Sequence, residues 1–248
     1  MALRAVIFDY GHTLIDFTPA EDALLPVYEQ IREILTARVH AEIPQAPDLI
    51  EAIARRVERM VDESYARRDL QELDIVSLFE QALGTANIEL PREMIQQIAE
   101  MEHRATNSAL TPNPGSAAAL AELHGLGLKI GVVSNAHFIP RLMREDLERF
   151  GLARYVDDAV FSSEIGVRKP HPAIFRKVLS ELDVQPEDAL FVGDRLRDDI
   201  SGAKALGMLG VLTRQFRQED LDESVAVPDF VVSDVSQIPP YVREILAQ

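Results

Sequence analysis

The chain of 248 residues contains no cysteine. It therefore forms no disulfide and has no thiolate for nucleophilic catalysis, iron–sulfur clusters or cysteine-type zinc sites. Positive charge is also scarce, because 25 lysines and arginines stand against 41 aspartates and glutamates and leave a net charge of −16. Such a chain repels nucleic acids and anionic membranes at long range, so we expect neither as a partner.

Long apolar runs are missing as well. No segment approaches the ~18 residues that suggest a membrane span. Asp9 interrupts the apolar stretch at residues 3–8, which is too short for the core of a signal peptide. We therefore expect a soluble, cytoplasmic protein. Its apolar share of 47% and its charged share of 27% are typical of folded domains.

Two patterns alternate along much of the chain. Short runs of β-forming residues predict strands, and beyond about residue 110 they alternate with segments of helical spacing. The predicted strands are residues 3–8, 128–133, 159–161, 189–192, 210–212 and 230–232. Alternation of strands and helices predicts an α/β fold with a three-layer core, in which helices cover both faces of a parallel sheet.

Residues 17–109 carry a different pattern, with apolar side chains at helical spacing and no strand signal. Pro26 suggests that the first helix of this block starts late or is kinked. The block therefore predicts an inserted, all-helical domain. The core domain then comprises residues 1–16 plus 110–248, and the helical domain comprises residues 17–109.

Polar side chains collect where the predicted core strands end. The active site of an open parallel sheet lies at the carboxyl ends of its strands, so we expect these side chains to converge. They are Asp9, Ser134, Asn135, Lys169, Asp194 and Asp199. Each alone has an ordinary explanation as a turn, a helix cap or a solvated group. Their common position at strand ends favours a site.

Carboxylates that converge without histidine or cysteine form a hard oxygen site, which suits Mg²⁺ better than zinc. A lysine and small polar groups beside the ion can neutralise a phosphoryl group, and a carboxylate can attack its phosphorus. The histidines show no metal-binding spacing; we expect His40, His103 and His124 on exposed helix faces.

Four segments, in this order, resemble the motifs of the haloacid-dehalogenase-like hydrolase superfamily. They are residues 8–14 (FDYGHTL), 133–135 (VSN), 166–172 (GVRKPHP) and 192–199 (VGDRLRDD). The resemblance implies a Rossmann-like core in which the helical insertion takes the place of the family's C1 cap. It also implies a Mg²⁺-dependent phosphoric monoester hydrolase that acts on a small phosphorylated metabolite through an aspartyl-phosphate.

The resemblance also implies the roles of individual residues. The metal ligands are Asp9, Asp194, Asp199 and the backbone carbonyl of Gly11. Asp9 is also the nucleophile, and Ser134 and Lys169 hold the phosphoryl oxygens as its catalytic partners. The predicted substrate-binding residues are Ser134, Asn135, Lys169 and His12.

One position departs from the family pattern. Family phosphatases carry a second aspartate two residues after the nucleophile, where it protonates the leaving group, and this chain has Gly11 there. General acid catalysis contributes roughly 10²–10⁴-fold. A weak catalyst, a substrate with a good leaving group, or a relocated acid such as His12 each fits the change. His12 can equally fill the loop and point to solvent.

The same residues bear on the other chemistries of the superfamily. Haloacid dehalogenases also lack the second aspartate, but they need no metal and do not keep the Gly193-Asp194 pair. Phosphonate hydrolases need a cap lysine, whereas Lys129, Lys169, Lys177 and Lys204 are the only lysines and lie outside residues 17–109. A dehalogenase-type hydrolase, or a weakened member that serves in binding or regulation, remains an alternative.

Overall fold

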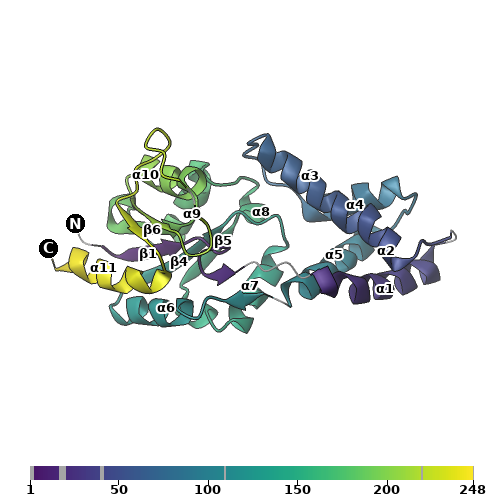
Figure 1. Ribbon diagram of the computed structural model, residues 1–248, viewed down its shortest axis with the longest axis horizontal. Coiled ribbons are helices and arrows are strands. Elements are labelled where there is room, and N and C mark those ends of the chain that lie inside the picture. Colours follow the sequence, from purple (N-terminus) through teal and green to yellow (C-terminus); the bar gives the residue numbers. More distant parts are fainter. Residues whose placement is uncertain (1–2, 17–20, 40–41, 109, 219, 248) are drawn as a thin grey trace. The chain divides into compact units, whose positions relative to one another are not determined.

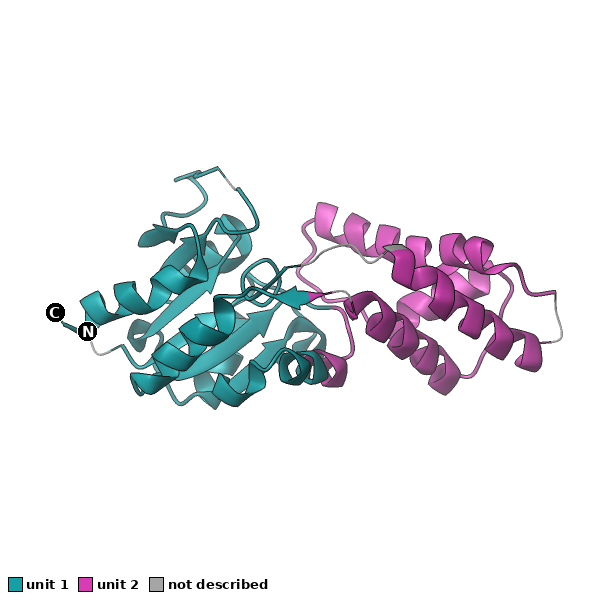
Figure 2. Ribbon diagram, turned by 60° about the horizontal axis from the view of Figure 1, so that its bottom comes forward, with its two compact units in different colours: residues 1–17, 111–136, 144–248 teal, residues 18–110, 137–143 magenta. Residues whose placement is uncertain are grey.

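In a computed structural model, residues 3–16, 21–39, 42–108, 110–218 and 220–247 are described. The chain divides into two compact units, which Figure 2 distinguishes by colour. The first unit comprises Met1–Phe17, Thr111–Ala136 and Arg144–Gln248, and the second comprises Thr18–Leu110 and His137–Met143. The segment His137–Met143, which we expected in the core domain, thus groups with the helical unit.

A six-stranded parallel sheet forms the centre of the first unit (Figure 1). The strand order is β5-β4-β1-β6-β7-β8. The strands are β1 (Ala5–Phe8), β4 (Lys129–Ser134), β5 (Asp158–Phe161), β6 (Ala189–Gly193), β7 (Leu209–Thr213) and β8 (Phe230–Val232). All four residues of β1 are buried, as expected for a central strand covered on both faces. The predicted α/β fold with a parallel sheet is confirmed.

Helices cover both faces of this sheet. Helices α9 and α10 lie on one side in Figure 1, and α6 and α11 lie on the other. The helices of this part of the chain are α6 (Ser116–Gly125), α7 (Pro140–Arg149), α8 (Ser162–Ile165), α9 (Pro172–Glu181), the π-helix η4 (Leu196–Ser201), α10 (Gly202–Ala205) and α11 (Ile238–Leu246). Phe175 and Val178 of α9 belong to one buried cluster with Ile7 of β1 and Phe191 of β6. Burial of this apolar surface fixes the sheet beneath the site.

Two very short strands stand where the chain leaves the first unit and returns to it. Strand β2 (Ile15–Asp16) pairs antiparallel with β3 (Thr111–Pro112), so Ile15 lies opposite Pro112. The hydroxyl of Ser116 also donates to the carbonyl of Leu14 at 2.9 Å. The segment that leads to the helical unit and the segment that returns from it are thus bonded to each other, next to the loop that follows β1.

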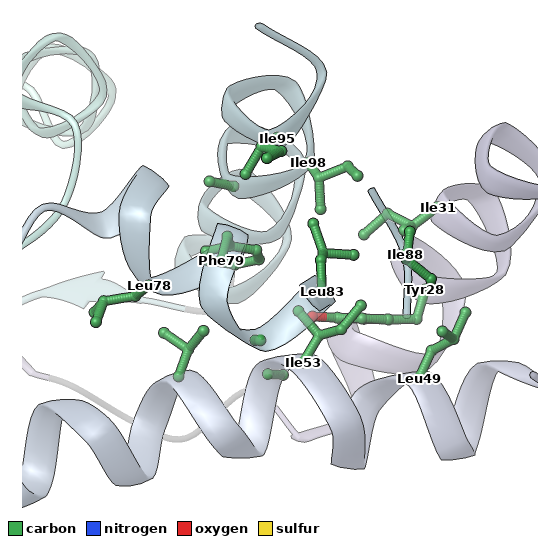
Figure 3. Close-up of a cluster of buried hydrophobic side chains, with 14 of the residues drawn as sticks. Tyr28, Ile31, Leu49, Ile53, Leu78, Phe79, Leu83, Ile88, Ile95 and Ile98 are labelled. Atoms are coloured by element: carbon green, nitrogen blue, oxygen red, sulfur yellow. The ribbon is translucent and has the colours of Figure 1, made fainter. Parts of the chain in front are cut away.

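The second unit is built from helices with a core of its own (Figure 3). They are α1 (Glu21–Arg38), α2 (Ala46–Leu49), the π-helix η1 (Ile50–Ala54), α3 (Arg55–Ala66), α4 (Ile75–Thr85) and α5 (Arg92–Asn107). The hydroxyl of Tyr28, inside this core, donates to the carboxylate of Glu102. Helix α1 begins at Glu21 and contains Pro26, so of the two alternatives expected for this proline a late start is wrong, and a kink stays a prediction. None of the helices in the described ranges is long and apolar enough to cross a membrane.

Candidate active site

The site lies at the point where the strand order reverses. From β1 the chain continues to β4 and β5 on one side of the sheet, and then crosses to β6, β7 and β8 on the other. In an open α/β sheet, a crevice forms at the carboxyl ends of the strands at such a switch point. The residues that follow β1, β4 and β6 therefore meet there.

Three buried carboxylates come together at this edge. Asp9 directly follows β1, and its backbone N–H donates to the carbonyl of Val192 at 2.8 Å, which extends the pairing with β6. Asp194 directly follows β6, and Asp199 lies in η4. Each side chain offers an oxygen atom within 4.8 Å of the others. The residues are 7%, 1% and 1% exposed, respectively, so little solvent screens their mutual repulsion.

Gly193 makes room for one of these carboxylates. A Cβ at this position would lie 2.4 Å from both Cγ and Oδ2 of Asp199, which is far inside van der Waals contact. The same Oδ2 accepts a hydrogen bond from the backbone N–H of Arg195 at 2.9 Å. The Gly-Asp pair at the end of β6 therefore holds Asp199 against the strand as well as supplying Asp194.

Lys169 joins two of the carboxylates. Its Nζ lies 2.6 Å from Asp9 Oδ1 and 2.7 Å from Asp199 Oδ1, and it also donates to the carbonyl of Val133 at 3.0 Å. Asp9 Oδ1 and the Val133 carbonyl accept hydrogen bonds from this ammonium group, and Asp199 Oδ1 forms an ion pair with it. The lysine is buried and offsets part of the negative charge of the triad.

Asn135 holds the backbone of Lys169. The Lys169 N–H donates to Asn135 Oδ1 at 2.7 Å, and Asn135 Nδ2 donates to the Lys169 carbonyl at 3.2 Å. This pair of bonds fixes the lysine relative to the end of β4, because Asn135 follows that strand directly. Ser134 is the last residue of β4 and is buried. In the sequence it stands between Val133, whose carbonyl Lys169 contacts, and Asn135.

Burial dominates the electrostatics of the triad. It raises the pKa of Asp9 to about 6, against the lowering influence of Lys169 and with further raising by Asp194. It raises the pKa of Asp199 to about 7, where Lys169 again lowers and Asp9 raises the value. The pKa of Asp194 is also raised by burial and by Asp199. Burial disfavours the charged form of Lys169, but Asp199 and Asp9 outweigh it and raise the pKa of the lysine.

The loop after β1 is closed by its own backbone. The N–H of Ile15 donates to the carbonyl of Tyr10 at 3.2 Å, and the N–H of His12 donates to the carbonyl of Ile15 at 2.7 Å. Among the described residues, none of these backbone bonds ends on the carbonyl of Gly11, which leaves it available to a cation.

His12 is half-buried in this loop and has a φ of 57°, a left-handed conformation that glycine adopts more easily. Its ring centroid lies 6.4 Å from that of Phe216. Burial lowers the pKa of His12, and the nearby Arg217 and Arg195 lower it further. Asp16 acts in the other direction and raises the pKa of His12.

Arg217 is a residue of the site that the sequence does not mark as functional. Its Nε donates to Asp194 Oδ2 at 2.6 Å from the loop that follows β7. Residues 210–212 were predicted to form a strand, so the rule that places functional groups at the carboxyl ends of strands also applied to residues 214–217. The arginine carries no motif of its own, which is why pattern matching did not find it.

The donor set at this edge fits a hard divalent cation. Three carboxylates with raised pKa values share one ammonium and one guanidinium contact. Oxygen ligands without nitrogen or sulfur are those that Mg²⁺ and Ca²⁺ prefer. A bound cation would relieve the repulsion that now keeps these carboxyl groups hard to ionise.

Comparison with known families agrees with this geometry. The family model described as haloacid dehalogenase-like hydrolase matches residues 3–207. Its span includes the helical unit and the strands β1, β4, β5 and β6, and it ends before β7 and β8. Three of the four motifs that carried the resemblance supply the buried triad and Lys169. The remaining one, residues 133–135, supplies Asn135 and the carbonyl that Lys169 contacts.

Known relatives have two different chemistries. A glyceraldehyde 3-phosphate phosphatase of Methanopyrus kandleri is 28% identical over 246 residues, which is 98% of each chain. A phosphoserine phosphatase of Thermus thermophilus is 36% identical over 126 residues, 50% of this chain and 49% of the relative. The crystal structure of a 2-haloacid dehalogenase from Pseudomonas syringae has a TM-score of 0.67 and 26% identity, covering 98% of this chain and 99% of that one.

Proposed function

Because the chain belongs to the haloacid dehalogenase-like hydrolase family, we propose that it is a Mg²⁺-dependent phosphoric monoester hydrolase. The single observation that carries the proposal is the buried triad of Asp9, Asp194 and Asp199. Lys169 and Arg217 bring two positive charges to these three carboxylates, so one negative charge, kept out of water, is left for a metal ion to offset. By the family pattern, haloacid dehalogenases need no metal and lack the Gly-Asp pair that this chain has at residues 193–194.

In the proposed reaction, Asp9 is the nucleophile. One of its carboxylate oxygens forms a bond to phosphorus while the bond from phosphorus to the leaving-group oxygen breaks, and water then hydrolyses the aspartyl-phosphate. Asp9, Asp194, Asp199 and the carbonyl of Gly11 would hold Mg²⁺, which supplies charge neutralisation for the phosphoryl oxygens.

Lys169 and Ser134 are assigned to the phosphoryl oxygens. Lys169 keeps its ammonium 2.6 Å from the proposed nucleophile, so a phosphoryl group bound at Asp9 comes within reach of this charge. Ser134 ends β4 beside the lysine contact. We assign Asn135 to positioning Lys169, because both polar atoms of its amide already bind the lysine backbone.

The leaving group has no aspartate at residue 11 to protonate it. His12 is the nearest titratable side chain in the loop, but burial and two arginines lower its pKa. The charged imidazolium is therefore less favoured than in an ordinary histidine. We propose that the enzyme hydrolyses substrates with good leaving groups faster than alkyl phosphates, since protonation matters less for them.

Small phosphorylated metabolites are the proposed substrates. The relative from Methanopyrus kandleri is named a glyceraldehyde 3-phosphate phosphatase, and the one from Thermus thermophilus a phosphoserine phosphatase. The net charge of −16 also disfavours large polyanions. We propose that the helical unit, with its independent core, is the C1 cap that selects among such metabolites.

A phosphatase screen tests the proposal. Wild-type protein is assayed against p-nitrophenyl phosphate and a set of phosphorylated metabolites, with Mg²⁺ and with EDTA, and Asp9→Asn provides the background. We expect Mg²⁺-dependent phosphate release that Asp9→Asn abolishes.

The alternatives give other results in the same screen. Chloride release from 2-chloropropionate in EDTA would instead identify a dehalogenase. Absence of turnover above the Asp9→Asn background, with ligands that still raise the melting temperature, would identify a binding protein.

A further inference from the structure

Arg217 contacts the proposed active site through only part of its guanidinium group. Its Nε donates to Asp194 Oδ2 at 2.6 Å. Within the described part of the chain, no residue accepts a hydrogen bond from its two Nη groups. An arginine carries five N–H donors in a fixed planar fork. Four of them are thus available beside a carboxylate of the triad.

Exposure separates Arg217 from the other cation of the site. The side chain of Lys169 is 2% exposed and that of Asp9 10%, whereas that of Arg217 is 37% exposed. A phosphoryl group must reach Asp9 and Lys169 to react, so it lies against the buried groups. A more exposed guanidinium at the same edge then faces the part of the substrate that remains outside, which is the leaving group.

The loop after β7 holds Arg217 in this place. Phe216, the preceding residue, has its ring centroid 6.4 Å from that of His12. Gln215 accepts a hydrogen bond through Oε1 from the backbone N–H of Val235 at 3.2 Å. With Asp194 holding Nε, the loop is tied to three separate segments, so the free Nη groups have a restricted orientation. Such preorganisation favours recognition of a planar anion.

We propose that Arg217 selects substrates whose leaving group carries a second anionic group, either a carboxylate or another phosphate. The guanidinium fork binds that group through its Nη atoms while Nε keeps its bond to Asp194. Arginine suits this role because both anions accept two parallel hydrogen bonds from it. The inference rests on the proposed phosphatase function, since it assigns the outer part of the same substrate.

Matched substrate pairs test the inference. Glycerol 3-phosphate and 3-phosphoglycerate share a carbon chain and differ by a hydroxymethyl group against a carboxylate. Fructose 6-phosphate and fructose 1,6-bisphosphate differ by a second phosphate. The measured quantity is the ratio of kcat/KM for the anionic member to that for its partner. Both members use the same metal site, so a change in metal affinity cancels in the ratio.

We expect wild type to prefer the anionic member of at least one pair, and the pair that shows it identifies the anion. Arg217→Gln should lower this ratio about tenfold or more, mainly through KM, because a charge-assisted bond is lost. Arg217→Lys should keep part of the preference. Arg197→Gln removes an exposed arginine of η4 and should leave the ratio unchanged.

Two outcomes would overturn the inference. One is a wild type without preference in either pair, and the other is an equal loss for both members in Arg217→Gln, which would assign the arginine to the phosphoryl group or to Asp194. Calorimetric binding of the same pairs to Asp9→Asn separates this question from catalysis. An Arg217-dependent preference in binding without any wild-type turnover would refute the phosphatase and retain the anion site.

Discussion

Replacing Lys169 by methionine tests the electrostatic account of the site most directly. The methionine side chain fills a similar volume but removes the charge between Asp9 and Asp199, which lie 2.6 and 2.7 Å from Nζ. Removing one partner of a buried ion pair typically costs about 3–5 kcal/mol, because the remaining charge has no compensation. For a chain of this size each kcal/mol lowers the melting temperature by roughly 2–4 °C, so we expect a loss of about 6–20 °C.

The loss should depend on pH in a defined direction. The pKa of Asp9 is about 6 and that of Asp199 about 7, both above the ordinary value of 3.8, so ionisation of these groups opposes folding. The opposition is absent below the ordinary value and complete above pH about 7. Lys169 lowers both pKa values in the wild type. Without it they rise further, so the difference between the proteins should grow from pH 5 to pH 8.

Lys204→Met is the matched control. Lys204 also pairs with an aspartate at 2.6 Å, Asp229, but its side chain is 34% exposed, so its loss should cost at most about 1 kcal/mol. Thermal unfolding of wild type and both variants, without metal and at pH 5 and pH 8, measures the comparison. If Lys169→Met is no less stable than Lys204→Met at pH 8, the triad does not depend on the buried ammonium and the reasoning fails.

Three further predictions use other features of the site. Gly193→Ala should displace Asp199 and cost about 1–3 kcal/mol. Gly84 in α4 is the control, because a Cβ added there meets no atom within 4 Å, so Gly84→Ala should be neutral or stabilising. If urea unfolding shows the same change in stability for both variants, Gly193 does not make room for Asp199. His12→Gly should be more stable than His12→Ala by about 1 kcal/mol, because φ is 57° there; equal midpoints would argue against backbone strain. The rise in melting temperature produced by Mg²⁺ should increase from pH 5 to pH 8, since Asp9 and Asp199 must lose protons, and should vanish in Asp194→Ala; a shift independent of pH would place the ion elsewhere.

The fold could be predicted from the sequence because its strongest signals are local. Each core strand is a short run of β-forming residues ended by polar ones, and β1 (Ala5–Phe8) is buried on both faces as such a run implies. The pairing of β2 with β3 could not be predicted, because two-residue strands, one ending in Pro112, carry no periodic signal. It depends on the return of the chain after the helical insertion.

The histidines show where local patterns fail. His103 was predicted to lie on an exposed helix face, and this prediction is wrong, because it is 4% exposed. Its ring lies against that of Phe138, with centroids 5.0 Å apart, and its Nε2 is 3.1 Å from Asn107 Nδ2. Phe138 is distant in the sequence, so the helical spacing of the residues around His103 does not predict this contact. His124 lies in the last turn of α6, and His40 lies outside the described residues.

The candidate site divides in the same way. The three aspartates and Lys169 could be identified because strand ends and motif spacing mark them. The double hydrogen bond of Asn135 to the Lys169 backbone could not, since the same amide also suits a ligand. Arg217 contacts Asp194 from a loop without a motif, 23 residues away. Long-range pairs of this kind depend on how loops cross the edge of the sheet.

General acid catalysis by His12 and metal binding by the carboxylates place opposite demands on pH. Mg²⁺ binding needs ionised carboxylates, whose pKa values reach about 6 at Asp9 and about 7 at Asp199. An imidazolium at His12 is instead favoured by low pH, because burial, Arg217 and Arg195 all lower the pKa of this histidine. A bound cation would add positive charge and lower the pKa of His12 further.

The raised pKa values of the carboxyl groups shift metal binding toward higher pH, and the lowered pKa of His12 shifts its imidazolium toward lower pH. The backbone of His12 is left-handed, with a φ of 57°, so glycine is the substitution that removes the side chain without backbone strain. If the side chain supplies no proton, the ratio of kcat/KM for p-nitrophenyl phosphate to that for glycerol 3-phosphate should be the same in wild type and His12→Gly. A selective loss of glycerol 3-phosphate hydrolysis in His12→Gly would instead identify His12 as the acid.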